Sequence, residues 1–231
     1  MGKLQGISSF FVPGPPARPG DAYQPIVQFL LKELRGNTVI DLGGGEGAYA
    51  LEIKKAGYDV IVADINSESL SVAERNGLKT RHLCLEEQLG ENLADTIVLI
   101  EVLEHVQDPK AFLKSAVQAT KKRVVFTLPC TDDFIPLFKK GLTYNHIAVS
   151  DHLWHFSYDE LKKILDSLEV EYYLTMGDYL FPKASIDILR ECFRSMKAFN
   201  TLMHLYSLFD RFGLITNRYP SRFYGIIEKS R

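Results

Sequence analysis

Short continuous hydrophobic runs alternate along the chain with longer segments in which apolar residues recur every three or four positions. Predicted strands occupy 37–42, 59–65, 78–84, 95–101, 123–129, 169–176 and 223–228, and those at 59–65, 95–101 and 123–129 are rich in Val, Ile and Leu. Segments with helical spacing lie between them, at 47–56, 67–76, 109–120 and 157–168. Because such alternation is typical of parallel sheets covered by helices, the pattern predicts an α/β fold.

The first 36 residues predict a leader followed by one helix. Residues 1–20 end in a segment rich in Pro and Gly, which we interpret as an irregular leader or a cover over a site. We expect Asp21 to cap the helix that follows and Gly36 to end it. Its apolar side chains share one face, which the core of the domain should bury.

An unusually long connection separates the last two predicted strands. Between Lys183 and Leu214 its apolar residues have helical spacing. We interpret 183–217 as a helical cap over a substrate, inserted into a main domain of 21–182 and 218–231. Packing on the sheet edge, a homodimer contact and an amphipathic membrane-surface helix around 199–214 are the alternatives.

Composition narrows the class of protein. The chain has 231 residues, 46% of them hydrophobic and 24% charged, which indicates a globular protein with one sizeable core. A formal net charge of −2 gives no overall attraction for nucleic acid, and we expect no DNA partner. Three scattered cysteines suit a reducing compartment. The start lacks the order of a signal peptide, and no apolar run is long enough for a transmembrane segment, so we expect a cytoplasmic protein.

The first βα turn contains the most specific pattern. The strand at 37–42 contains Asp41, and Gly43, Gly45 and Gly47 follow it before the next helix begins. Glycines at this place allow left-handed backbone angles and close approach of a ligand to the main chain. A pyrophosphate would be repelled by the Asp41 carboxylate, which argues against a dinucleotide. The second strand ends in Asp64, where a carboxylate can bind a ribose diol.

This arrangement resembles class I S-adenosylmethionine (SAM) dependent methyltransferases over 21–180 and 222–229. The resemblance implies a doubly wound, Rossmann-like, mostly parallel sheet of seven strands, antiparallel at the final strand. SAM has no phosphate and contains a sulfonium cation and an ammonium group, so an acid in the glycine turn is favourable. The implied cofactor-binding residues are Asp41, Gly43 and Gly45 at the methionine part, Asp64 and Ile65 at the ribose, Leu85 and Glu86 at the adenine, and Glu101 beside the sulfonium. Tyr23 reaches the methionine end in this interpretation, or only packs on its helix.

Methyl transfer to oxygen benefits from a general base, because the hydroxyl proton must leave as the new bond forms. His105 follows a central strand, where open α/β sheets bind ligands, and His152 precedes the helix after the fifth strand. We take these two as the catalytic candidates, with His146 and His155 as further histidines nearby. A lone histidine is more often a packing residue, and that alternative stays open.

The same segment allows a metal hypothesis. Glu101, Glu104 and His105, in the pattern E-x-x-E-H, together with His152, resemble the metal-binding set of small-RNA 3′-terminal 2′-O-methyltransferases and some ubiquinone-type O-methyltransferases. Two carboxylates and two imidazoles could hold Mg²⁺ or a transition ion. The alternative is that Glu-His-Val only ends a strand and starts a helix. We favour this alternative, so a divalent metal is a secondary expectation.

The segment Glu101 to Pro109 also resembles methyltransferases related to ubiquinone O-methylation. We therefore expect a SAM-dependent methyltransferase that methylates oxygen on a small metabolite, a glycan or a lipid-like acceptor in a biosynthetic pathway, and releases S-adenosylhomocysteine (SAH). A metal-dependent RNA 2′-O-methyltransferase and a non-catalytic SAM-binding module are the competing hypotheses.

Overall fold

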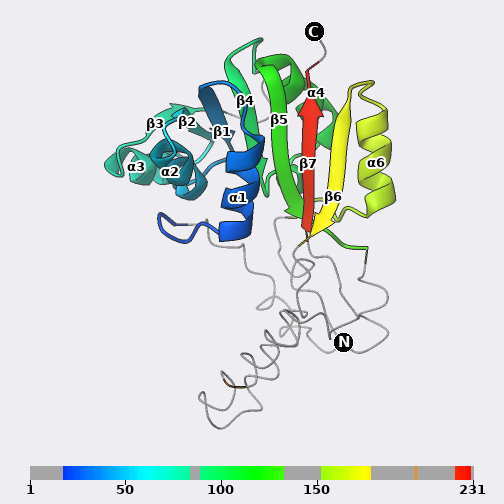
Figure 1. The fold of residues 1–231 in the computed structure, drawn as a ribbon, viewed down its shortest axis with the longest axis horizontal. Helices are drawn as coiled ribbons and strands as arrows, with labels where there is room; N and C mark the ends of the chain where they lie inside the picture. The colour runs from blue at the N-terminus through cyan, green and yellow to red at the C-terminus, as the bar shows by residue number, and fades with distance from the viewer. Residues whose placement is uncertain (1–17, 84–88, 133–151, 178–200, 202–221, 230–231) are drawn as a thin grey trace, which may run out of the picture.

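The computed structural model describes residues 18–83, 89–132, 152–177, 201 and 222–229. Seven strands form a single sheet in the order β3-β2-β1-β4-β5-β7-β6 (Figure 1). Their bounds are β1 (Thr38–Leu42), β2 (Asp59–Asp64), β3 (Lys79–His82), β4 (Ala94–Ile100), β5 (Thr120–Pro129), β6 (Tyr172–Gly177) and β7 (Arg222–Glu228). The predicted seven strands are therefore present, and most of them are shorter or shifted by one to three residues.

The direction of the strands matches the expected fold class. Strands β1 and β2, β1 and β4, β2 and β3, and β4 and β5 pair in parallel. Strand β7 runs antiparallel to both of its neighbours, β5 and β6. The predicted antiparallel final strand is confirmed. Because β7 alone is reversed, its first residue lies at the edge where the parallel strands have their carboxyl ends.

Helices cover both faces of the sheet. Helices α1 (Gln24–Glu33), α2 (Ala48–Lys55) and α3 (Ser67–Arg75) bury one apolar cluster against it. Helices α4 (Pro109–Ala119) and α6 (Tyr158–Asp166) bury a second cluster on the opposite face (Figure 1). A short 3₁₀ helix, η1 (Leu103–His105), follows β4. The aliphatic side chains of the central strands β1, β4 and β5 thus face one of two cores, as a doubly wound sheet requires.

Local signals explain most helix starts. Pro109 is the first residue of α4, and the Asp108 side chain caps the helix by accepting from the Ala111 N–H. Ser157 and Glu160 form a reciprocal capping box at α6. The prediction that Asp21 caps the first helix was wrong. Helix α1 begins at Gln24, with Tyr23 in the N-cap position and no side-chain cap.

The start of α1 follows from Pro25. This proline lies in the first turn of the helix, where its missing N–H costs no hydrogen bond and its fixed φ angle favours the helix. The helix therefore begins next to Pro25, and Asp21 is too far upstream to reach the first free N–H groups. The expected end near Gly36 is close to the observed C-cap residue, Leu34.

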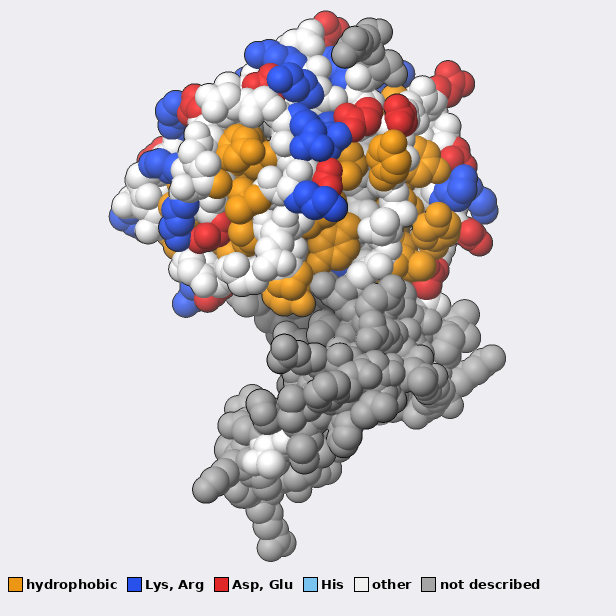
Figure 2. All heavy atoms as spheres, in the orientation of Figure 1, with side chains coloured by type: hydrophobic (Ala, Val, Ile, Leu, Met, Phe, Trp, Pro, Cys, Tyr) orange, Lys and Arg blue, Asp and Glu red, His pale blue; other side chains and the backbone are white. Residues whose placement is uncertain are grey.

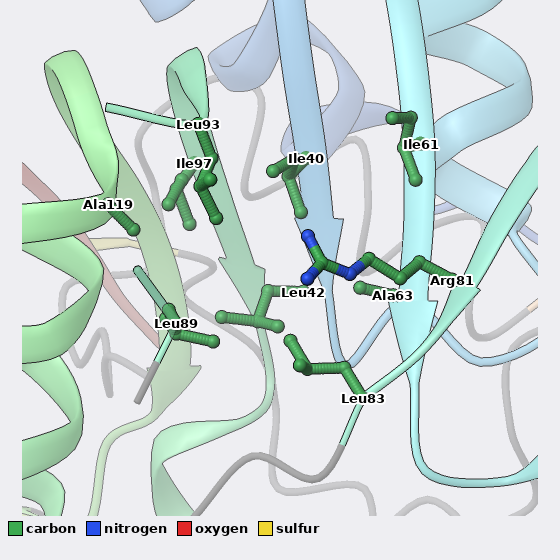
Figure 3. Close-up of a pocket in the computed structure, with 10 residues that line it drawn as sticks. All are labelled: Ile40, Leu42, Ile61, Ala63, Arg81, Leu83, Leu89, Leu93, Ile97 and Ala119. Carbon is green, nitrogen blue, oxygen red and sulfur yellow. The ribbon is translucent and has the colours of Figure 1, made fainter. Parts of the chain in front are cut away.

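The connection from β3 to β4 leaves a small apolar hollow on the face covered by α4 and α6. Figure 3 shows the Arg81 guanidinium lying among the aliphatic side chains that line it. The space inside is about 30 Å³, which is room for one or two water molecules.

Glu228, the last residue of β7, forms an ion pair with Arg123 of β5. The Arg123 guanidinium donates to the Glu33 carboxylate at 2.8 Å and also pairs with Glu228. Only 9% of the Arg123 side chain is exposed. One buried cation thus joins α1, β5 and β7, three elements that are distant in the sequence.

Most of the predicted leader, 1–20, and all but one residue of the predicted cap, 183–217, lie outside the described residues. The helices within the described ranges are too short, or not apolar enough, to cross a lipid bilayer.

Replacing Arg123 by Ala should lower the free energy of unfolding by about 2 to 3 kcal/mol, because two carboxylates lose the cation between them. Lys122 is the matched control. Its side chain is 50% exposed and pairs with Asp95 at 3.6 Å, so its replacement by Ala should cost less than about 1 kcal/mol. Urea denaturation of both variants measures the difference, and equal losses would contradict this account of Arg123.

Candidate functional site

The glycine turn after β1 lies at the carboxyl edge of the parallel strands. Gly43, Gly45 and Gly47 all have positive φ angles. At Gly43 a side chain would also collide with Val102, since its Cβ would lie 2.7 Å from the Val102 Cγ2. The turn therefore requires glycine for conformation and for space.

Asp64, at the end of β2, fixes this turn. Its Oδ2 accepts a hydrogen bond from the Gly45 N–H at 2.9 Å, and its Oδ1 accepts from the Asn66 N–H at 2.8 Å. Ile65 follows directly and is 55% exposed. A carboxylate held by two backbone donors, with an exposed apolar side chain beside it, fits the predicted ribose position.

Asp41 is buried beneath the same turn, with a relative exposure of 1%. A Cβ at Gly44 would lie 2.6 Å from the Asp41 Oδ2, so the turn packs directly on the carboxyl. Within the described ranges that oxygen has no hydrogen-bond partner. Burial, and then the negative charge of Asp64, raise the pKa of Asp41 to about 7, although the Ala50 N–H opposes the shift.

Glu101 lies at the end of β4 in a left-handed conformation, with a φ of 55°. Its Oε1 accepts from the Thr127 hydroxyl at 3.0 Å and from the Arg222 Nε at 3.0 Å. The Arg222 guanidinium also lies over the Tyr23 ring, 5.4 Å from its centroid. The start of β7 and the start of α1 thus converge on the carboxyl end of β4.

The sequence analysis missed two residues of this group, Arg222 and Tyr49. Burial raises the pKa of the Tyr49 phenol, which also senses the charges of Arg222, Glu101 and Asp41. Tyr49 is the second residue of α2, which directly follows the glycine turn, and this position could have indicated from the sequence that its side chain lies near the turn. Arg222 could have been found from the antiparallel final strand, which places its first residue at the carboxyl edge.

A second group of polar side chains surrounds η1. Glu104, His105 and His152 each offer a ligand atom, and these atoms lie within 4.8 Å of one another. The rings of His105 and His152 pack edge to face, with centroids 4.8 Å apart. His155 is more distant, at 6.2 Å from the His152 ring. The structure therefore brings together the two predicted catalytic histidines.

Main-chain hydrogen bonds fix the position of His152. The Leu153 and Trp154 N–H groups donate to the Glu104 carbonyl, at 2.8 and 3.2 Å. The Trp154 indole donates to the Val106 carbonyl at 2.9 Å. The segment that contains His152 is thereby attached to η1 although it lies almost fifty residues away in the sequence.

The predicted four-residue metal set is divided in the structure. Glu101 pairs with Arg222 and is not a member of the group formed by Glu104, His105 and His152. Two imidazoles and one carboxylate fit a transition ion such as zinc better than Mg²⁺, which prefers oxygen ligands. The remaining three residues could hold such an ion, and it would then polarise a bound hydroxyl.

Three further sequence candidates cannot be placed. Leu85 and Glu86, predicted at the adenine, and His146 lie outside the described residues.

Comparisons with known proteins indicate the family and the fold. The family model described as a methyltransferase domain matches residues 18–172. A ubiquinone biosynthesis O-methyltransferase of Aliivibrio fischeri is 28% identical over 160 residues, which are 60% of this chain and 65% of that protein. One of Bordetella avium is 31% identical over 103 residues, which are 41% of this chain and 43% of that protein. The chain thus spans about two thirds of the curated relatives it matches, or less.

Solved structures share the fold. A SAM-dependent methyltransferase of Thermotoga maritima, described as a possible histamine N-methyltransferase, has a TM-score of 0.61 at 14% identity and covers 90% of each chain. Magnesium protoporphyrin IX methyltransferase of Synechocystis, with bound SAH, has a TM-score of 0.57 at 15% identity and covers 88% of this chain and 80% of that one.

The raised pKa of Asp41 predicts a pH-dependent stability. Because the folded pKa of about 7 lies above the ordinary value of 3.8, the protonated carboxyl stabilises the fold at low pH, and this contribution falls as the pH rises from 3.8 to about 7, above which it is lost. Relative to Asp41→Asn, the wild-type free energy of unfolding should fall by roughly 1.4 kcal/mol per pH unit from pH 5 to 7 and then level off. Denaturation curves at several pH values test this, and parallel curves for the two proteins would refute it.

Proposed function

The chain belongs to the methyltransferase domain family, among the class I SAM-dependent enzymes, and we propose that it transfers the methyl group of SAM to an oxygen of a small-molecule acceptor. The observation that supports this most strongly is the pair of acids at the glycine turn. Asp41 is buried under the turn and Asp64 is hydrogen-bonded to its backbone, so the site favours a cation and disfavours a phosphate.

SAM fits the residues at this edge. The Gly43 to Gly45 backbone and Asp41 would hold the methionine part, Asp64 and Ile65 the ribose, and Leu85 and Glu86 the adenine. Glu101 would lie beside the sulfonium, with Tyr23 and Tyr49 at the methionine end. When bound, SAM supplies a methyl group activated by the positive sulfur.

Oxygen is the proposed acceptor atom for two reasons. The curated relatives are named as ubiquinone biosynthesis O-methyltransferases. Two histidines, His105 and His152, lie together at the carboxyl edge, where one of them can accept the hydroxyl proton as the bond to the methyl carbon forms. Glu104 would orient this pair. A metal held by Glu104, His105 and His152 is the second candidate for the same task.

The proposed methyl acceptor is a small metabolite, a glycan or a lipid-like molecule, methylated in a biosynthetic reaction of the cytoplasm. A cap formed by 183–217 would cover it, and a homodimer contact is the alternative role for that segment. RNA is less suitable, because on the face shown in Figure 2 Lys and Arg are interspersed with Asp and Glu and do not form one basic patch. A non-catalytic SAM-binding module would bind SAM and produce no SAH.

Incubation of the protein with SAM and a panel of hydroxylated metabolites should release SAH. Asp64→Asn should weaken SAM binding at least about tenfold, since the ribose and the turn both lose a charged acceptor. Glu68→Gln, in the exposed first turn of α3, is the control and should bind SAM normally. Binding of SAM with no SAH release from any acceptor would support the module instead.

The role of the histidine pair is tested by substitution and by chelation. His152→Gln should lower kcat about 100-fold with little change in SAM affinity, as expected for loss of a general base. The exposed His155→Gln should retain activity. We expect thorough chelation to leave the rate unchanged. Loss of activity on chelation, restored by zinc or magnesium, would replace the base by a metal held by Glu104, His105 and His152.

A further inference from the structure

Arg222, the first residue of β7, contacts residues at the end of β4 and at the start of α1. Its Nε donates to the Glu101 carboxylate at 3.0 Å, and its guanidinium lies over the Tyr23 ring, 5.4 Å from the centroid. Only 15% of the Arg222 side chain is exposed. A guanidinium that contacts a carboxylate and an aromatic ring at once has a defined position at this edge.

The same part of the edge borders the glycine turn. The turn packs against the segment that follows β4, since a Cβ at Gly43 would lie 2.7 Å from the Val102 Cγ2. The Tyr49 phenol, in the first turn of α2, accepts a hydrogen bond from the Tyr23 N–H and senses the charge of Arg222. Arg222 therefore lies beside the elements to which the proposed function assigns the methionine part of SAM.

The charges of this ligand part require more than acids. The methionine part contains an ammonium and a carboxylate on the same carbon. Asp64 and Glu101 suit the ammonium and the sulfonium, but both repel the carboxylate. A carboxylate that leaves water needs a cation or several N–H donors, because burial of an uncompensated charge is strongly unfavourable. An edge with several acids thus needs a cation for the remaining charge of the ligand.

A guanidinium is suited to this task. It offers five N–H donors in a planar fork that matches a carboxylate, and Glu101 is bound through the Nε. One guanidinium can hold two carboxylates, as Arg123 does with Glu33 and with Glu228 at the other end of β7.

We propose that Arg222 binds the carboxylate of the methionine part of SAM, so that the last strand of the sheet contributes a residue to the cofactor site. This inference rests on the proposed function, because it assigns a further binding residue to the same site. Arg222 takes no part in the methyl transfer itself. It holds SAM and SAH alike, since both contain the carboxylate.

Decarboxylated SAM, which lacks this carboxylate and retains the sulfonium and the amine, is the probe. In isothermal titration calorimetry, the full chain should bind SAM at least about tenfold more tightly than decarboxylated SAM, because the probe loses its charge-assisted hydrogen bonds to Arg222. Equal affinities for the two ligands would overturn this proposal without any variant and leave the proposed function intact. Failure to bind SAM, SAH and the probe would overturn both.

Variants identify the residue. Arg222→Gln should weaken the binding of SAM and SAH at least about tenfold and change that of decarboxylated SAM less than about threefold. Arg222→Lys keeps the charge without the planar fork and should retain part of the preference for SAM. Arg75→Gln, in the last turn of α3, is the matched control and should bind each ligand as the wild type does.

An equal loss of affinity for SAM and for decarboxylated SAM in Arg222→Gln would indicate a purely structural role and overturn the proposal. Thermal denaturation shows whether each variant is folded. If Arg222→Gln does not fold, the wild-type comparison and Arg222→Lys still decide the question.

Discussion

The hydrogen bond from the Gly45 N–H to the Asp64 carboxylate joins the turn after β1 to the end of β2. It fixes the turn, and it places the negative charge of Asp64 close to the buried Asp41 carboxyl. Burial and this charge together disfavour ionisation of Asp41 and raise its pKa to about 7. A cation bound at this edge would favour the ionised form of Asp41, so the proposed preference for a sulfonium nucleoside depends on how the turn is held.

Local signals were sufficient to predict the fold class and many boundaries. Pro109, the capping pair Ser157 and Glu160, and the glycine turn act within a few residues, so the sequence alone indicates them. The antiparallel final strand came from the family resemblance. Arg222 and Tyr49 were missed because their importance depends on which elements meet at the carboxyl edge. Asp21 does not cap α1, because the helix begins at Gln24, next to Pro25.

The division of the E-x-x-E-H segment has a conformational cause. A spacing of three residues would place Glu101 and Glu104 on one face of a helix. Instead, Glu101 directly follows β4 with a positive φ, and a 3₁₀ turn begins two residues later, so Glu101 lies beside Arg222 whereas Glu104 lies with His105 and His152. Such strain in a non-glycine residue persists when its surroundings over-determine it, as Thr127 and Arg222 do here. The segment therefore contributes Glu101 to the carboxyl end of β4 beside Arg222, and Glu104 and His105 to the group around His152.

The place of β7 between β5 and β6 also affects how the protein can be made. Among the described strands β6 pairs with β7 alone, and residues 178–221 separate the two in the sequence. During synthesis β6 leaves the ribosome before β7. Until β7 follows, the backbone N–H and C=O groups of β6 are exposed to water. Arg123 can pair with Glu33 before then, but its pair with Glu228 and the pair between Glu101 and Arg222 can form only once β7 has been synthesised, so the carboxyl edge is completed together with the sheet.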